Sequence, residues 1–588
     1  MLHKRSSLAR ALLACLLVVA LPQIAPAQTS TGPVESETTA ATPDESAQRA
    51  LDPVLQEAMR AAMAVGSDPL PAGLEMTPEF IATLVQDQAE DDRDEFELSL
   101  LDAVELAVRH NLTVQVSRYN QDISYEGIDS NRAAFDPVIS FTVPQRFSRS
   151  TTPASTQTEG ADIVTSENFS GGFTYRETIE WGTNWQVNWG GTRNVTNNEF
   201  SFNNPTLTSN LSFTVTQPLL RGFGSVNRTG ILVAQNSYEG SKEAFRGQLE
   251  QILLQTYQAY WGLVLQIETL QVREDALELA QNQLNRNRIQ VEIGTLAPIE
   301  TVQSERQVEN AVLALIQQQN AVANQEDQLK QILNLEAVRP DALELRLVPT
   351  TELGYSTAPI DEEAAIATAL QRDPQLLQTR LNLESDLLNL KQARNAQLPT
   401  VNLSAGMTLN GRAGDRLIRA PDGSISEIQQ AGFSQALAQI LSGDFNTWNV
   451  GVTVQLPIHN YAADANHARA SISERQRRVS LEQRRQQVVF DVRRTARGIE
   501  SGVRQVETAQ IATGLSERQL QAEQRKFEVG TSTNFQVLQF QDQLSQARLS
   551  EIQAIANFLF ARADFELTKG TILEFFGVSV SEAGTGRR

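Results

Sequence analysis

The sequence predicts a mainly helical fold with a β-barrel portion, built from one structural unit that is used twice. Two stretches lack proline and read as single helices, from about Gly222 to Ile293 and from about Ala462 to Val529. Both far exceed the 20 to 25 residues usual for globular helices. A run of alternating apolar and polar residues precedes each stretch, which is typical of β-strands. The predicted unit is therefore a helix, a β-hairpin, a long helix and a return helix.

The first residues have the features of a secretory signal. Basic side chains at positions 3–5 precede an apolar run over 11–21, and Ala25-Pro26-Ala27 is a small-x-small cleavage site. Residues 1–27 are therefore predicted to be a signal peptide. A lipoprotein signal that uses Cys15 is the alternative, although the apolar run continues through that residue.

Composition and charge exclude several classes of protein. The net charge of −21 becomes −24 once the signal's three cations, Lys4, Arg5 and Arg10, are removed, which excludes a nucleic-acid binder of the usual basic kind. Cys15 is the only cysteine, so the mature chain has neither disulfides nor thiolate chemistry. The four histidines are scattered, and no phosphate loop or nucleophile with a neighbouring base occurs. We expect no enzymatic activity, no cofactor and no metal site.

The first half of the chain follows the predicted unit. Residues 28–97 are acidic and rich in Pro, Ser and Thr, which indicates a solvated periplasmic extension. The first repeat covers residues 98–336, in which a helix is followed by a β-hairpin over 138–217, a long helix over 222–293 and a return helix over 298–335.

The second half repeats this plan after a connector. Residues 337–361 contain three prolines and form that connector. The second repeat covers residues 362–575, with a β-hairpin over 400–456, a long helix over 462–529 and a return helix over 533–569. A polar tail, 576–588, ends the chain.

Matching residues align the two repeats. The pairs are Asn111 with Asp373, Pro137 with Pro399, Pro218 with Pro457, and Gly294-Thr295 with Gly530-Thr531. The offset is 262 residues for the first two pairs, 239 for the third and 236 for the last. Most of the difference in length therefore lies between the prolines that open and close the strands, where a surface loop can grow. These four prolines are predicted to mark the transitions between strand and helix.

Four alternating runs place all their apolar residues on one face and small polar residues on the other. The runs begin at Ile139, Leu211, Val401 and Trp448. This pattern fits membrane β-barrel strands, which are apolar outside and polar inside; a hairpin that caps a coiled coil is the alternative. Four strands cannot close a barrel, since about eight are needed, so several chains must share one.

Two further alternating runs lie between the first and second of these strands. One carries Phe169, Phe173 and Tyr175, and the other carries Trp185 and Trp189. They are either an extracellular hairpin or an added pair of membrane strands.

The chain resembles the TolC-like outer-membrane efflux proteins. The signature segments are Leu101–Ala107 with Asn111, Gln217–Gly222 and Phe527–Thr531, and the duplicated unit covers about residues 98 to 575. The resemblance implies a homotrimer with a shared twelve-stranded barrel, embedded in the lipid of a Gram-negative outer membrane and continued by a periplasmic α-helical barrel.

The resemblance also implies a function. It is that of a passive exit duct in a tripartite efflux or type I secretion system, with a periplasmic adaptor protein and an inner-membrane pump as partners. The pump is either a resistance-type pump or an ABC exporter. The alternative is a periplasmic or surface coiled-coil scaffold without channel activity.

The same resemblance implies two kinds of site. The turns at the lower end of the tunnel contact the adaptor in this family, and they correspond to Ile293-Gly294-Thr295 and Val529-Gly530-Thr531. Each glycine is also explained as a helix cap. Acidic residues often close the tunnel six and nine positions after the turn glycine. The matching positions are Glu300 and Gln303 in the first repeat, and Gln536 and Gln539 in the second. Three copies of Glu300, one from each chain, would form one gate ring. The alternative is that Glu300 is a solvated carboxylate in a first helical turn.

Overall fold

The structure of the protein is a computed structural model that describes residues 95–153, 163–198, 200–342, 344–351, 359–420 and 425–578. Contacts divide the chain after Pro69, and all described residues belong to the second unit. The predicted signal peptide with Cys15, the extension up to residue 94 and the tail beyond residue 578 lie outside the described residues. Within the described part of the chain, no helix is long and apolar enough to cross a membrane.

The helix that opens each repeat is interrupted at the aligned polar residue. The pieces are α4 (Leu100–His110) and α5 (Leu112–Arg132) in the first repeat, and α8 (Glu362–Arg372) and α9 (Pro374–Ala396) in the second. Asn111 is extended at φ −63° and ψ 123°, and its Oδ1 accepts from the backbone N–H of Thr113 at 2.8 Å. Asp373 accepts from the N–H of Leu376 at 2.6 Å, and Pro374 occupies the first helical position. Both markers are therefore helix N-caps.

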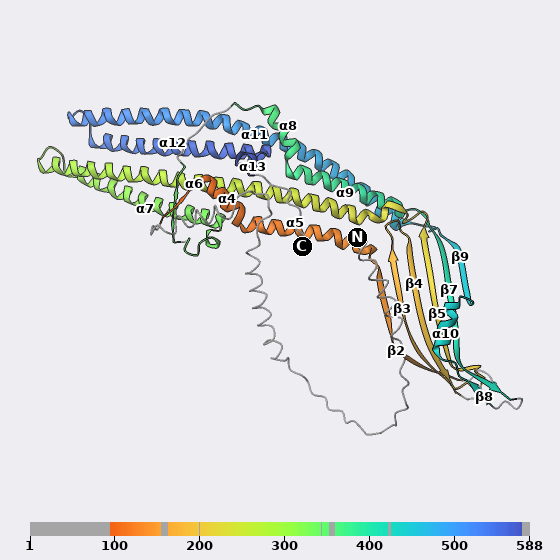
Figure 1. Ribbon diagram of the computed structural model, residues 1–588. Helices are drawn as coiled ribbons and strands as arrows, with labels where there is room; N and C mark the ends of the chain where they lie inside the picture. The colour runs from red at the N-terminus through yellow and green to blue at the C-terminus, as the bar shows by residue number, and fades with distance from the viewer. Residues whose placement is uncertain are drawn as a thin grey trace, which may run out of the picture. The chain divides into compact units, whose positions relative to one another are not determined.

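Two long helices each return through a second helix. They are α6 (Thr229–Glu292) with α7 (Ile299–Leu333), and α11 (Tyr461–Glu528) with α12 (Asn534–Lys569). Helix α6 begins later than the predicted Gly222, because Gly222 and Gly224 have φ of 80° and 78° and a 3-10 turn covers Gly224–Arg228. Helix α12 packs against both α11 and α6, so the two helix pairs share one core (Figure 1).

The six longest strands form one antiparallel sheet in which β2, β3, β4, β5, β7 and β9 are successive neighbours (Figure 1). Their bounds are β2 Val138–Pro153, β3 Ile163–Thr178, β4 Asn184–Thr196, β5 Asn203–Pro218, β7 Thr400–Arg419 and β9 Asn446–Gln455. A short strand, β8 (Ile425–Gln429), pairs antiparallel with the last residues of β7. Pro137 and Pro399 directly precede β2 and β7, Pro218 ends β5, and Pro457 follows β9 by two residues.

The β-hairpin predicted over 138–217 is a four-stranded meander, because β3 and β4 stand between β2 and β5. The two middle runs are thus strands of this sheet, paired on both sides. Aromatic side chains on neighbouring strands stabilise this order. Ring centroids of Phe173 lie 6.3 Å from Phe141 on β2 and 5.9 Å from Trp189 on β4.

A short uncharged helix, α10 (Phe433–Ser442), lies between β7 and β9 in the sequence. It packs on the apolar face of the sheet, against β5 and β7. A Cβ added to Gly411 of β7 would lie 1.9 Å from the carbonyl oxygen of Ala436. Phe433 meets Trp189 edge to face at 6.5 Å between ring centroids. Glycine at position 411 therefore permits the close approach of α10 to β7.

Segments predicted to be solvated or irregular contribute to the core. Strand β1 (Glu95–Leu98) pairs in parallel with β6 (Arg346–Pro349), so the extension ends before residue 95 and the connector contains a strand. The predicted polar tail begins with Phe576 and Val578, which are both buried. Alternation and polarity did not predict these short pieces because each is ordered by contacts with distant helices.

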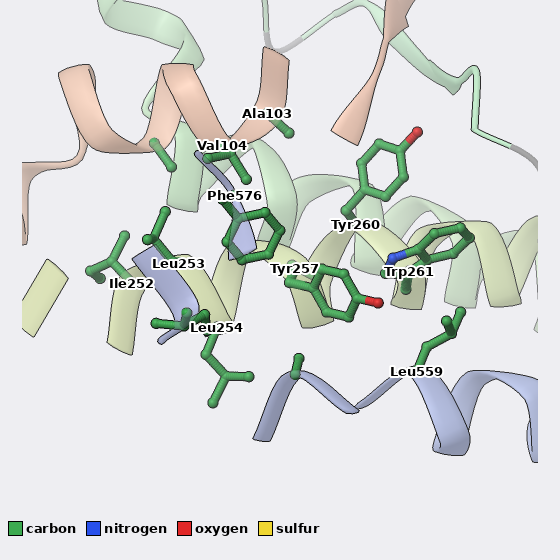
Figure 2. Close-up of a cluster of buried hydrophobic side chains, with 14 of the residues drawn as sticks. Ala103, Val104, Ile252, Leu253, Leu254, Tyr257, Tyr260, Trp261, Leu559 and Phe576 are labelled. Carbon is green, nitrogen blue, oxygen red and sulfur yellow. The ribbon is translucent and has the colours of Figure 1, made fainter. Parts of the chain in front are cut away.

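The largest apolar cluster gathers around the middle of α6. Figure 2 shows the side chains of Leu253, Tyr257, Tyr260 and Trp261 from α6, Val104 from α4, Leu559 from α12 and the C-terminal Phe576. The Tyr260 side chain is fully buried, and its hydroxyl donates to the carbonyl of Leu98 at 3.1 Å. Burial of aromatic and aliphatic side chains in this way stabilises such a junction.

A buried carboxylate lies near this cluster, beside the junction of α8 and α9. Glu250 of α6 is 2% exposed, and its Oε1 lies 3.3 Å from Nε of Arg246. Burial raises the pKa of Glu250 to about 7, Arg246 acts against this rise, and Asp373 adds to it. Asp373 is itself held by Arg484 of α11, with N–O distances of 3.1 and 2.6 Å.

Replacing Glu250 by glutamine should remove one source of pH-dependent stability. The pKa is about 7 in the folded state against 4.5 ordinarily, so the unfolded chain loses its proton first as the pH rises. The free energy of unfolding should therefore fall between about pH 4.5 and 7 and stay constant above that range. We expect Glu250→Gln to be more stable at pH 8 by about 1–2 kcal/mol and to lack this fall, in urea unfolding at both ends of the range. The control variant Glu278→Gln, at an exposed position of the same helix, should keep the fall in the free energy of unfolding. An identical pH dependence in wild type and Glu250→Gln would contradict the assignment.

Candidate functional site

The candidate site lies where each long helix turns into its return helix. In the first turn, the N–H of Gly294 donates to the carbonyl of Val291 at 3.0 Å, and that of Thr295 donates to Gln290 at 2.9 Å. Gly294 has φ 76°, a conformation that favours glycine. The hydroxyl of Thr295 donates to the same Gln290 carbonyl at 3.0 Å. The Gly-Thr pair thus caps α6 in a Schellman-type turn.

The second turn repeats this arrangement bond for bond. Gly530 has φ 78°, and its N–H donates to the carbonyl of Phe527 at 3.0 Å. The N–H and hydroxyl of Thr531 donate to the carbonyl of Lys526 at 2.9 and 3.1 Å. The two turns are therefore equivalent structures at the ends of equivalent helices.

Substitution of the turn glycine should cost stability through backbone conformation alone. No atom lies within 4 Å of a Cβ added to Gly530, so Gly530→Ala brings no clash and only the strain of a positive φ, about 1 kcal/mol. Gly514, inside α11, also has open space around its added Cβ. Gly514→Ala should instead stabilise the helix by about 0.5–1 kcal/mol. Urea unfolding of both variants checks the opposite signs, and equal effects would contradict this account.

Both turns carry exposed apolar side chains. Ile293 is 67% exposed and Val529 is 74% exposed, each directly before the turn glycine. Further apolar residues nearby, Ile299 and Phe535, are also exposed. Apolar side chains gathered on an exposed tip are typical of a contact surface for another protein.

Behind the turns, a buried network of polar side chains joins the two helix pairs. Asn534, the first residue of α12, accepts at Oδ1 from Gln283 Nε2 and Asn287 Nδ2 of α6, both at 2.9 Å. Its own Nδ2 donates to Glu300 Oε2 of α7 at 3.1 Å. Asn287 also donates to Ser304 Oγ of α7 at 2.6 Å. Apart from Glu300, these side chains are at most 2% exposed, so α12 is fixed to α6 and α7 by bonds that water does not replace.

A second buried polar contact lies at the turn between α11 and α12. Glu523 of α11 is buried and receives a hydrogen bond from the hydroxyl of Ser532 in the turn. Lys526 Nζ lies 3.0 Å from the other carboxylate oxygen. The bond from Ser532, and then Lys526, hold the pKa of Glu523 below its ordinary value. Glu523 therefore stays ionised and fastens the turn to α11 down to acidic pH.

The four residues predicted as gate candidates have different surroundings. Glu300 is half-buried and bonds to Asn534, as described above. Gln536 is exposed and forms a capping box with Thr533 at the start of α12. Gln303 is half-buried and Gln539 is exposed, and neither is brought into the Asn534 network. The structure therefore assigns Gln536 a capping role and brings only Glu300 of the four into the network.

Sequence reasoning missed Gln283, Asn287, Ser304 and Asn534. The signal that could have found them is the repeat itself. When the two repeats are aligned with the 236-residue offset of the turn glycines, Asn287 corresponds to Glu523. Both positions are polar and both are buried. A polar residue at the same buried position of two helix pairs indicates a specific contact rather than a solvated face. Among the residues that the structure describes, no group of His, Cys, Asp and Glu could hold a metal ion.

The fold and the site define a class of protein: a duplicated helical unit with an amphipathic sheet at one end and capped helical turns at the other. A model of the family described as outer membrane efflux protein matches residues 103–335 and 365–567. The chain belongs to this family, which confirms the resemblance seen in its sequence. The family is one of efflux proteins and not of enzymes.

Individual relatives agree. The chain is 24% identical over 356 residues to the outer membrane efflux protein BepC of Brucella suis, over 59% of this chain and 69% of that protein. It is 24% identical over 330 residues to the outer membrane protein TolC of Escherichia coli, over 55% and 62% of the two chains. The match thus spans less than two thirds of the Escherichia coli protein.

Solved structures show the same fold. The outer membrane channel CmeC of Campylobacter jejuni superposes with a TM-score of 0.56 at 14% identity, over 80% of this chain and 86% of that one. The outer-membrane channel OprN superposes with a TM-score of 0.58 at 13% identity, over 86% and 95%.

Proposed function

We propose that this protein is the outer-membrane exit duct of a tripartite efflux or type I secretion system, through which substrates pass passively to the exterior. The observation that carries the proposal is a sheet with one apolar and one polar face, joined at its strand ends to paired long helices. Such a sheet suits lipid on one side and a water-filled lumen on the other. Membership of the efflux protein family supports it.

Closure of the sheet requires more than one chain. The strands β2 and β9 are the outer members of the six-stranded path, and among the residues that the structure describes each of them pairs with a strand on one side only. Free edges with unpaired backbone groups do not persist inside a bilayer. We propose that three copies pair β2 of one chain with β9 of the next, and that their helices form a common periplasmic tube.

The two capped turns are the proposed docking points for the periplasmic adaptor. The exposed side chains of Ile293 and Val529 and the matched backbone of the two turns support this role. Two equivalent tips per chain would offer an adaptor a repeated surface. The inner-membrane pump would then be reached through the adaptor.

The buried network around Asn534 is the proposed fastening of the closed lower end. It links the return helix α12 to α6 and α7 through neutral amides and one carboxylate. Opening by movement of α12 would have to break these bonds. A ring of acidic side chains at Gln536 and Gln539 is not needed for this mechanism.

Membrane fractionation and planar-bilayer recording test the function. We expect the protein to fractionate with outer membranes, to be extracted by detergent as a trimer and to conduct ions in bilayers. A water-soluble rod without conductance would instead support the coiled-coil scaffold and overturn the proposal.

A further inference from the structure

The β3–β4 hairpin occupies a place that the duplicated unit does not require. Strands β2, β5, β7 and β9 each connect directly to a helical segment, whereas β3 and β4 connect only to each other at the helical end of the sheet. The second repeat has two strands in the corresponding path, β7 and β9, which pair directly. Along the six-stranded path, the first repeat therefore contributes four strands and the second repeat two, and the short β8 pairs only with one end of β7.

The register shows that these two strands continue both faces of the sheet. One row across the sheet is apolar on all six strands: Ile139, Tyr175, Val187, Phe213, Met407 and Trp448. The adjacent row is small and polar on all six: Ser140, Thr174, Asn188, Ser212, Thr408 and Thr447. A hairpin projecting into water would have no reason to keep this alternation in register with membrane strands.

The turn between β3 and β4 is also built into the helical end. The carbonyl of Trp181 accepts from the N–H of Gly224 at 3.1 Å, and Glu180 lies 3.3 Å from Arg228. Gly182 has φ 93°, and a Cβ there would lie 2.2 Å from the carbonyl oxygen of Gly222. The turn is thus fitted to the loop that starts α6, and the hairpin ends at the same level as its neighbours.

We propose that β3 and β4 are membrane-spanning strands of the barrel. Three copies of the chain would then build a barrel of eighteen strands, six from each chain, continued by the tube of long and return helices. This inference rests on the proposed function and differs from the twelve strands expected from the resemblance. Strands of 16 and 13 residues are long enough, since a tilted membrane strand needs about 9–11. Barrel diameter grows roughly linearly with strand number, so the outer-membrane lumen would be about 1.5 times as wide as with twelve strands.

Nitroxide labels on β4 and β5 test the placement in the intact protein in liposomes. The single cysteine of the sequence, Cys15, lies in the predicted signal peptide, so introduced cysteines are labelled alone. We expect Val187→Cys to be relaxed mainly by oxygen, which dissolves in lipid, and Asn188→Cys mainly by a water-soluble nickel chelate. Phe213→Cys and Ser212→Cys on β5 are the reference pair and should behave in the same way. Access of the nickel chelate to both β4 labels, with normal alternation on β5, would overturn the inference alone. Loss of alternation on both strands would overturn the proposed function as well.

Disulfide formation tests the strand order independently. Ser140→Cys with Thr174→Cys places cysteines on paired positions of β2 and β3 and should cross-link within one chain. Ser140→Cys with Ser212→Cys should not, because three strand spacings, about 14 Å, separate them in this sheet. In a twelve-stranded barrel β2 and β5 would be neighbours, so efficient cross-linking of the second pair would exclude eighteen strands. The mass of the detergent-extracted particle should equal three chains, and any other number would also contradict the count.

Discussion

Replacing Asn534 by alanine should loosen the lower end of the duct. The variant removes the acceptor shared by Gln283 and Asn287 and the donor to Glu300, all buried or half-buried. Neutral hydrogen bonds of this kind contribute about 0.5–1.5 kcal/mol each and a bond to a carboxylate about 1.5–3, so the two neutral bonds and the one bond to Glu300 give an expected loss of about 2.5–6 kcal/mol in the fastening of α12. Because 1.4 kcal/mol corresponds to a factor of ten, the open fraction should rise at least about 60-fold.

Planar-bilayer recording of the purified trimer measures this effect directly, as longer and more frequent high-conductance openings. Gln539→Ala is the matched control, since Gln539 lies on the same helix but is exposed and outside the network. Its conductance should equal that of the wild type. Equal conductance in Asn534→Ala would show that the network stabilises the fold without restraining the opening.

The ends of the long helices could be predicted from the sequence to within one residue, except for the start of α6, which lies seven residues after the predicted Gly222. Helix α11 was expected over 462–529 and covers Tyr461–Glu528, because absent prolines and a Gly-Thr cap are local signals. The break at Asn111 was missed although the residue itself was chosen as a repeat marker. One extended residue hardly disturbs the helical periodicity of apolar side chains on either side, so the interruption is visible only in the cap hydrogen bonds.

The strand order and the buried network could not be predicted in the same way. Alternation identified the runs that became β3 and β4, but the choice between a separate hairpin and added sheet strands depends on pairing across the sheet. Gln283 and Asn287 both lie in α6, where many neighbouring side chains are polar, so that the sequence does not distinguish a buried amide from a solvated one. Only the meeting of α6, α7 and α12 distinguishes them, and that contact joins residues roughly 250 positions apart.

A second large effect is expected when a charge is placed on the apolar face of the sheet. Phe213 and Ser212 are adjacent on β5 and point to opposite faces, and Phe213 is 46% exposed beside Val187 and Met407. Arginine on a lipid-facing strand position costs about 2–4 kcal/mol at the bilayer midplane, whereas lumen positions tolerate charge. We expect Phe213→Arg to lose that much stability and to yield little folded trimer, and Ser212→Arg to yield normal trimer.

The two variants carry the same charge on neighbouring residues of one strand, so they separate the environment of the face from strand propensity and net charge. Heat-modified mobility in gels, after folding into liposomes of defined thickness, gives the yield of each. If the apolar face were covered by another protein rather than by lipid, a thinner bilayer would not change the penalty for Phe213→Arg. In lipid, the penalty should fall as the bilayer becomes thinner, because arginine then reaches the interface more easily. The ratio of the two yields across bilayer thickness therefore tests whether lipid or protein covers the apolar face of the sheet.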